Sequence, residues 1–227
     1  MFDAFLADRA REEGTEFVPF DAHTDYERYV DGRPREDGIR TFLAARGIRL
    51  PDGGDDDPVG APTVRGLGLL KNADVVQRIA AGEVEVFDGS VDFVRRVRAA
   101  GYATAVVSSS ANTPEILRVV GIESLFDARV DGNVARERGL PGKPAPDTFL
   151  AGAAELRVSP SEAVVFEDAT AGVAAGQAGG FALVVGVDRS TDLTSDARAR
   201  ELLAHGADIV VRDLSELETP EPVNRNE

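Results

Sequence analysis

Two adjacent carboxylates, Glu167 and Asp168, directly follow the apolar run AVVF. Two such groups at the end of a buried strand repel each other unless a cation lies between them. Magnesium is a hard cation that takes oxygen ligands, so the pair is a candidate Mg²⁺ site. The alternative is structural, with Asp168 as the N-terminal cap of a helix over ATAGVAAG.

Hydroxyl and amide side chains follow a second apolar run, in the stretch ATAVVSSSAN. Ser108, Ser110 and Asn112 lie just before a predicted helix, where hydrogen-bond donors suit a phosphate group. The alternative is again a set of helix caps. Lys143, in GKPAP, precedes a further predicted helix. Its ammonium is either a phosphate ligand or a solvent-exposed charge.

Lysine is rare in this sequence. Of the 25 basic residues only Lys71 and Lys143 are lysines, and the others are arginines. Arginine and lysine are not interchangeable at a tight site, because the ammonium is compact and the guanidinium is a planar fork. The two lysine positions are therefore candidates for functional sites.

The elements that must position these residues alternate along the chain from about residue 84. Periodicity predicts strands over 103–110, 127–132, 162–168, 181–187 and 207–213, and helices over 88–101, 113–121, 145–157, 171–180 and 195–206. This alternation predicts an α/β fold, with a Rossmann-like, mostly parallel sheet that has helices on both faces. The polar groups above then lie at the carboxyl ends of strands, where open sheets bind ligands.

The first 80 residues differ from the rest of the chain. They contain helical patterns over 1–13, 24–30, 36–46 and 71–81 and no convincing buried strand. We therefore expect a small helical domain over 1–82, an α/β core over 83–216 and a flexible tail over 217–227.

Composition excludes several classes of function. Forty acidic residues against 25 basic give a net charge of −15, which disfavours nucleic-acid and anionic-membrane partners. The absence of cysteine excludes disulfides, thiolate metal sites and a cysteine nucleophile. The contexts of His23 and His205 are unrelated, which disfavours a histidine triad or zinc site. With no stretch as long as a membrane span and no signal peptide, we expect a cytoplasmic protein.

The motifs in their order resemble the haloacid dehalogenase (HAD) superfamily. Ser108 after an apolar strand, then GKPAPDTF, then VVFEDATAGVAAGQAGG are similar to its second, third and fourth motifs. VEVFDGSVDFV, GLLKN and YVDGRPREDGIRTFL are similar to the β-phosphoglucomutase-like subfamily, in which the helical segment is a cap domain. The resemblance covers the whole chain except the acidic tail.

This resemblance implies Mg²⁺-dependent phosphoryl transfer. Ser108 would hydrogen-bond the transferring phosphoryl group, and Lys143 would neutralise its charge. Asp168 would ligate Mg²⁺, with Glu167 beside it. Ser110 and Asn112 would hold the phosphate that is not transferred.

In the cap, the resemblance implies that Arg35 clamps that second phosphate and that Gly32 allows a close backbone approach. Lys71 would reach the sugar or its phosphate. Two positions depart from the subfamily pattern: Leu70 stands where many relatives have arginine, and Gly38 where serine is common. Both leave the identity of the sugar open.

One motif of the superfamily is missing from the chain. The reaction needs an apolar strand that ends in Asp-x-Asp, whose first Asp attacks phosphorus and whose second transfers a proton. FDAFLAD has no strand before it, and Asp55 and Asp57 lie in a polar loop. We therefore expect that the nucleophile and the acid/base Asp are absent, that Met1 corresponds to an internal position of the relatives, and that this chain alone is inactive. Loss of a central strand would leave two neighbouring strands with unpaired backbone groups.

The expected reaction is that of a β-phosphoglucomutase, which interconverts glucose 1-phosphate and glucose 6-phosphate. The mutase is favoured because Arg35 and Lys71 would hold a second phosphate. The alternatives are a HAD-type sugar-phosphate phosphatase and a non-catalytic phosphate-binding module. We expect a monomer whose partner is a small phosphorylated sugar, with Mg²⁺ as cofactor.

Overall fold

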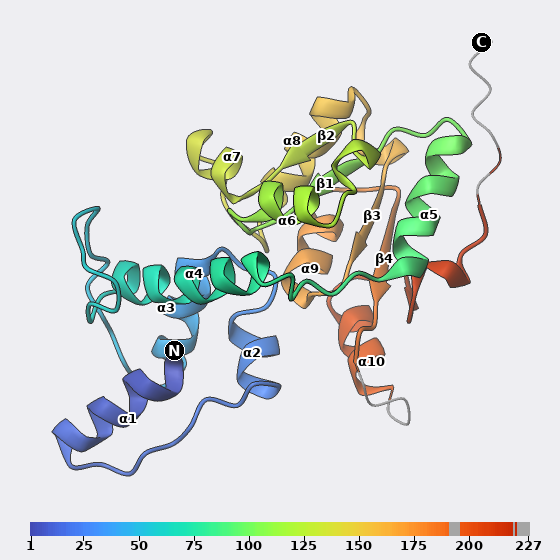
Figure 1. The fold of residues 1–227 in the computed structure, drawn as a ribbon. Coiled ribbons are helices and arrows are strands. Elements are labelled where there is room, and N and C mark those ends of the chain that lie inside the picture. The colour runs from blue at the N-terminus through green and yellow to red at the C-terminus, as the bar shows by residue number, and fades with distance from the viewer. Residues whose placement is uncertain (191–195, 220, 222–227) are drawn as a thin grey trace. The chain divides into compact units, whose positions relative to one another are not determined.

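The computed structural model describes residues 1–190, 196–219 and 221 (Figure 1). Contacts divide the chain into two compact units. The helical unit comprises Met1–Asp31 and Arg35–Ala81, and the α/β unit comprises Gly32–Pro34 and Gly82–Glu227. The short segment Gly32–Pro34 therefore belongs by its contacts to the α/β unit, although both of its neighbours along the chain belong to the helical unit.

The helical unit is built from α1 (Phe2–Glu13), α2 (Thr24–Tyr29), α3 (Arg35–Ala45) and α4 (Val64–Ala80). Buried apolar side chains of this unit meet in one core, against which Tyr29 of α2 also packs: Phe2, Leu6, Val30, Ile39, Phe42, Leu43, Val64 and Leu67. The ring of Phe2 lies against those of Phe20 and Phe42, with centroids 4.8 Å and 4.5 Å away. Aromatic pairs at this spacing add to the stability that burial alone provides.

Helix α4 begins seven residues before the predicted start at 71. The extra turns contain Gly66 and Gly68, which lower helix propensity and hide the helical pattern. The structure gives a reason for Gly66: a Cβ there would lie 2.5 Å from the carbonyl oxygen of Ala61. Thr63 caps the helix, because its Oγ1 accepts a hydrogen bond of 2.9 Å from the Gly66 N–H.

All five predicted strands are present in the α/β unit, and each is shorter than its predicted range. β1 (Ala105–Val107) pairs in parallel with β2 (Ala128–Val130). β3 (Val164–Glu167), β4 (Leu183–Val187) and β5 (Ile209–Val211) form a second parallel sheet in that order. The predicted α/β class with parallel strands is confirmed. Within the described residues, however, the strands form two sheets instead of one.

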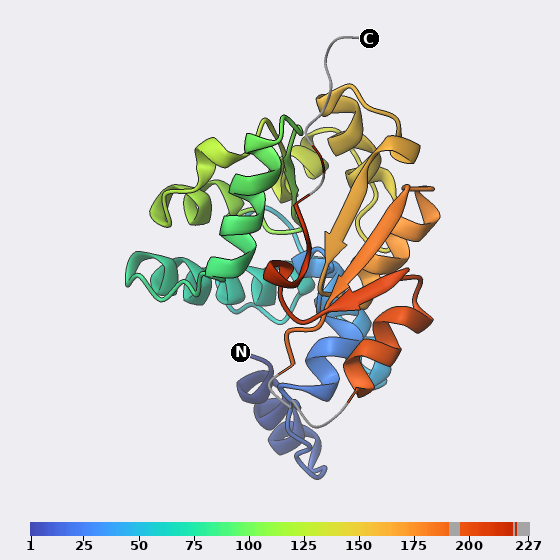
Figure 2. The same cartoon turned by 90° about the vertical axis from the view of Figure 1, so that its right-hand side faces the viewer.

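Helices cover both faces of the three-stranded sheet (Figure 2). On one face, Val184 of β4 packs with Val173 of α9 (Thr170–Ala178) and Leu202 of α10 (Ala197–Ala204). On the other, Val185 of β4 packs with Phe93 of α5 (Asp88–Ala99). Consecutive residues of β4 thus point into different cores, which explains its continuous apolar run.

The helix layer that contains α9 and α10 also reaches the two-stranded sheet. Phe149 of α8 (Asp147–Leu156) belongs to the same core as Val165 of β3, and Val107 of β1 packs against that core. Helix α6 (Thr113–Val119) follows β1. Short 3₁₀ turns complete the unit: η1 (Glu123–Leu125), η2 (Pro160–Glu162) and η3 (Leu214–Glu216).

Two sequence interpretations differ from the structure. The sequence predicts that the run AVVF is buried, but Val164 is 44% exposed and Phe166 36%, because β3 lies at the edge of its sheet among the described residues. Helix α7 (Gly132–Glu137) was not predicted. Asp131 caps it by accepting hydrogen bonds from the N–H groups of Asn133 and Val134, a local signal that the apolar pattern does not carry.

The described part of the predicted tail lies against α5. Arg96 donates hydrogen bonds to the carbonyl of Leu217 and to the hydroxyl of Thr219, and the Tyr102 hydroxyl donates to the carbonyl of Glu221. Residues 220 and 222–227 of that tail lie outside the described residues. Among the described helices, none combines the length and the apolar character needed to cross a membrane.

Candidate active site

Two buried, oppositely charged side chains, Lys143 and Glu167, meet at the carboxyl end of β3. The Lys143 ammonium donates to Glu167 Oε2 at 2.8 Å, and it lies 4.4 Å from the centroid of the Phe149 ring. Lys143 is only 5% exposed. Burial raises the pKa of the Glu167 carboxyl, while the neighbouring Lys143 charge acts to lower it. The structure thus joins Lys143 and Glu167 directly, whereas the sequence assigned them to phosphate and metal respectively.

The backbone of α9 leaves room for this pair. A Cβ at Gly172, in the first turn of α9, would lie within 2.1–2.3 Å of the Glu167 side chain. Gly172 is a residue that the sequence interpretation missed, although the glycine in EDATAG is a local signal for such a close approach.

Asp168 differs from its neighbour because its side chain is exposed. Its carboxylate makes no hydrogen bond to any described residue, so its oxygens remain available as ligands. Mg²⁺ commonly uses one or two protein carboxylates and completes its shell with water and substrate oxygens. Asp168, with Glu167 beside it, fits that donor chemistry. Within the described part of the chain, no group of three or more His, Cys, Asp or Glu side chains could hold a metal ion alone.

The carboxyl end of β1 carries the predicted serine cluster. The Ser108 N–H donates to the carbonyl of Val130 in β2, which extends the pairing by one residue. Ser108 Oγ accepts from the Ser110 N–H at 3.1 Å, and Ser110 Oγ accepts from the Asn112 N–H at 3.1 Å. The three predicted residues therefore form one half-buried chain of hydrogen bonds that leads into α6. Asn112 is the N-cap residue of α6, but no side-chain hydrogen bond among the described residues caps the helix, so the capping interpretation is not supported and the phosphate-binding one stays a prediction.

Gly32 lies close to the same region of the α/β unit. Its φ of 70° favours glycine, and a Cβ would lie 2.6 Å from the Cβ of Ala169. Its carbonyl accepts a hydrogen bond of 2.7 Å from Ser109 Oγ. The Gly32 backbone thus lies close to Ala169, whereas the predicted approach to a phosphate stays a prediction. Ser109 is a partner that the sequence interpretation missed.

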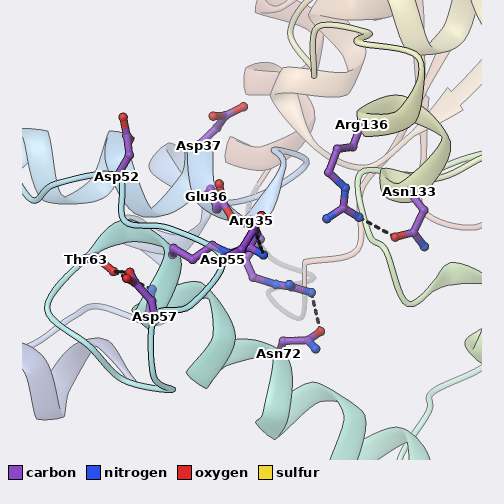
Figure 3. A network of polar contacts seen from close by, with 12 residues as sticks. Arg35, Glu36, Asp37, Asp52, Asp55, Asp57, Thr63, Asn72, Asn133 and Arg136 are labelled. Carbon is purple, nitrogen blue, oxygen red and sulfur yellow. Dashed lines mark hydrogen bonds and ion pairs between the residues drawn. The ribbon is translucent and has the colours of Figure 1, made fainter.

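The helical unit carries the other predicted group of cations. The Arg35 guanidinium, at the start of α3, donates to the side-chain oxygen of Asn72 at 2.7 Å (Figure 3). Lys71 precedes Asn72 on α4 and is half-buried, with its ammonium 5.8 Å from the centroid of the Tyr26 ring. Asn72 was not predicted, although it follows the predicted lysine directly in GLLKN.

Lys71 and Arg35 influence each other electrostatically. Burial lowers the pKa of the Lys71 ammonium, the positive charge of Arg35 lowers it further, and Asp31 acts in the opposite direction. A bound anion would relieve the repulsion between the two cations. The pair is therefore a candidate anion site within the helical unit.

The chain is similar in sequence to known proteins of one family. A family model described as haloacid dehalogenase-like hydrolase matches residues 3–180. A β-phosphoglucomutase of Mycobacterium bovis is 52% identical over 217 residues, which cover 96% of this chain and 82% of that protein. A β-phosphoglucomutase of Bacillus subtilis is 32% identical over 88% of this chain and 78% of its own length.

Solved structures show the same fold. The crystal structure of a β-phosphoglucomutase from Clostridium difficile matches with a TM-score of 0.67 at 20% identity, over 96% of this chain and 86% of that one. With more than three quarters of its residues matched by the family model, and with relatives above 30% identity along nearly its whole length, this chain belongs to the haloacid dehalogenase-like hydrolase family.

Proposed function

We propose that this protein catalyses Mg²⁺-dependent phosphoryl transfer on a small sugar phosphate, as a β-phosphoglucomutase that interconverts glucose 1-phosphate and glucose 6-phosphate. The observation that carries the proposal is that each unit has its own group of positively charged or hydrogen-bond-donating side chains. Lys143 and the Ser108–Asn112 cluster lie in the α/β unit, and Arg35 with Lys71 in the helical unit. The 52% identity to a protein named β-phosphoglucomutase supports it.

In this proposal the side chains of the α/β unit act at the transferring phosphoryl group. Ser108 donates its hydroxyl to a phosphoryl oxygen, and Lys143 balances the negative charge that develops there. Asp168 and Glu167 would hold Mg²⁺, which supplies further charge neutralisation on the phosphoryl oxygens. Lys143 also balances the charge of the buried Glu167 carboxylate. Its ammonium would therefore interact with both the phosphoryl group and Glu167.

The second anion site separates a mutase from a phosphatase. A mutase must retain a sugar that carries phosphate at either of two positions, whereas a phosphatase releases its product after transfer to water. The planar guanidinium of Arg35 can donate two parallel hydrogen bonds to phosphate oxygens. Lys71 adds a second positive charge, and a bound anion would relieve the repulsion between it and Arg35. A phosphatase remains the alternative if this site binds only the sugar.

We propose further that the nucleophilic carboxylate is supplied by a strand outside the printed sequence. Within the described residues, β1 and β3 each pair on one side only, and both end at candidate site residues, Ser108 and Glu167. Exposed Val164 and Phe166 support an apolar neighbour for β3. The M. bovis relative is also longer than the stretch that matches. A parallel apolar strand between β1 and β3 would satisfy both edges.

The chemistry of that strand is that of an aspartyl-phosphate. One carboxylate oxygen attacks phosphorus, the bond from phosphorus to the sugar oxygen breaks, and a second carboxyl group gives that oxygen a proton. In a phosphatase the phosphoryl group then passes to water. In a mutase it passes to a hydroxyl of a sugar phosphate, whose own phosphate is the second phosphate that Arg35 and Lys71 would hold. Without the strand, the chain keeps the side chains that would bind a sugar phosphate but has no nucleophile. It would then be a non-catalytic phosphate-binding module, which is the third candidate function.

The test compares the 227-residue chain with a form extended at its N-terminus by the upstream in-frame sequence. We expect that sequence to encode an apolar run ending in Asp-x-Asp, and a stop codon immediately upstream would contradict this. Both forms are assayed with β-glucose 1-phosphate and p-nitrophenyl phosphate in the presence of Mg²⁺. The matched control has the extension with both aspartates changed to asparagine.

Three outcomes separate the candidates. Glucose 6-phosphate formed only by the extended chain with intact aspartates supports the mutase. Release of p-nitrophenol and inorganic phosphate without glucose 6-phosphate supports the phosphatase. Binding of sugar phosphate with no turnover by the extended chain would overturn the enzymatic proposal in favour of a binding module.

A further inference from the structure

We propose that Arg198 is a positioning residue for the Asp168 carboxylate. Its Nη2 donates a hydrogen bond of 2.7 Å to the backbone carbonyl of Asp168, 30 residues away in sequence. This inference rests on the proposed function, because it takes Asp168 as a ligand of Mg²⁺. Nothing in the sequence motifs points to Arg198, which lies in the first turn of α10.

The direction of the Asp168 side chain depends on its backbone. Asp168 and Ala169 form a two-residue link between β3 and α9, and the Asp168 carboxylate makes no hydrogen bond to the described residues. Ala169 is 1% exposed, so its backbone is enclosed by the protein. The peptide group that joins Asp168 to Ala169 is therefore held by the burial of Ala169 and by the bond from Arg198 to the Asp168 carbonyl.

Arg198 is itself held firmly. It is 9% exposed, and its Nη1 donates to Glu201 Oε2 at 3.1 Å, one turn further along α10. Leu202, four residues after Arg198, is fully buried and packs in the same core as Val173 of α9. A buried guanidinium needs such partners, because leaving its charge unpaired would be strongly unfavourable.

The Arg198 bond is charge-assisted, since a guanidinium donates to a neutral carbonyl. Replacing Arg198 with methionine keeps most of the apolar stem but leaves the Asp168 carbonyl without its donor. The link can then rotate, and the carboxylate no longer points in one direction. Residues that orient a metal ligand in this way contribute about 10–100-fold to metal affinity.

The test uses the full chain and three variants. Arg198→Met removes the donor, and Arg198→Lys keeps a charge without the planar fork. Arg200→Met is the matched control, because Arg200 lies on the same helix and is exposed. Mg²⁺ affinity is measured by calorimetry, hydrogen exchange is followed in peptides covering 164–173, and thermal unfolding reports on the fold.

We expect Arg198→Met to weaken Mg²⁺ binding about 10–100-fold and to speed amide exchange at 168–172. Arg198→Lys should fall between Arg198→Met and the wild type, and Arg200→Met should match the wild type. Wild-type Mg²⁺ affinity in folded Arg198→Met and Arg198→Lys would overturn the positioning role, even if local exchange rises. A wild-type chain that binds no Mg²⁺ would overturn the proposed metal site and this inference with it, so the two failures are distinguishable.

Discussion

The two lysines of this protein lie in opposite electrostatic settings. Lys143 in the α/β unit is buried and bonded to a carboxylate, Glu167, at 2.8 Å. Lys71 in the helical unit is half-buried beside a like charge, Arg35, and its pKa is lowered. An ammonium next to a carboxylate is already compensated, whereas two neighbouring cations favour an added anion. We therefore expect Lys143 to stabilise the folded protein, and we propose that Lys71, on which burial and Arg35 outweigh the opposing charge of Asp31, contributes to a ligand site.

The largest expected effect is the loss of the buried pair. Lys143→Met leaves the Glu167 carboxylate buried without its cation, so we expect the free energy of unfolding at pH 7 to fall by about 3–5 kcal/mol. Urea denaturation followed by circular dichroism measures this. The double variant Lys143→Met/Glu167→Gln should recover part of the loss, because no unpaired charge remains. A loss for Lys143→Met no larger than that of an exposed lysine would contradict the pairing.

The same pair predicts a pH dependence. Burial raises the folded-state pKa of Glu167, so the folded state binds more protons than the unfolded state above the ordinary pKa of glutamate. This contribution to stability is complete below that pKa and is lost as pH rises through the folded value. The defect of Lys143→Met should therefore shrink toward acidic pH, as denaturation curves at several pH values will show. A defect that is constant or larger in acid would be incompatible with this assignment.

A smaller effect is expected from Gly172→Ala in α9. Its Cβ would collide with the Glu167 side chain, and overpacking of this kind costs about 1–3 kcal/mol. Gly54→Ala is the control, since a Cβ there meets nothing within 4 Å. Chemical denaturation compares the two. Equal stability of both variants would show that Glu167 does not pack against α9 as described.

The smallest effect on stability, with the opposite sign, is expected at Lys71. Because its folded-state pKa is lowered, the folded state binds fewer protons near the ordinary lysine pKa, and stability rises with pH in that range. Lys71→Met should remove this rise and leave the free protein as stable or slightly more stable at pH 7. Arg78→Met, on the exposed face of α4, is the control. A clear loss of stability in Lys71→Met alone would contradict the like-charge description.

The sequence predicts the fold better than it predicts the contacts at the site. The pattern of apolar runs locates all five strands of the described residues. β4 is buried on both faces and apolar throughout, and β3 keeps an apolar run although Val164 and Phe166 are exposed. Periodicity fails at the start of α4, where Gly66 is required by its close approach to Ala61. It also cannot show that β1 and β3 are edge strands, because edges depend on pairing between distant segments.

At the site, the sequence shows which residues end up at strand ends but not which atoms meet. Lys143 and Glu167 are 24 residues apart, and only the packing of α8 against the sheet brings them together. Arg198 comes from a helix that carries no motif. Asn72 and Ser109 each adjoin a predicted residue, yet their partners, Arg35 and Gly32, are set by tertiary structure.

The most direct test of the proposed mutase activity identifies the phosphorylated products. The N-terminally extended chain is incubated with β-glucose 1-phosphate and Mg²⁺, and the products are identified by ³¹P NMR for the wild type and for Lys71→Met. We expect glucose 6-phosphate from the wild type, and a shift toward inorganic phosphate in Lys71→Met because the second phosphate is held less firmly. Inorganic phosphate as the sole product of the wild type would contradict this expectation.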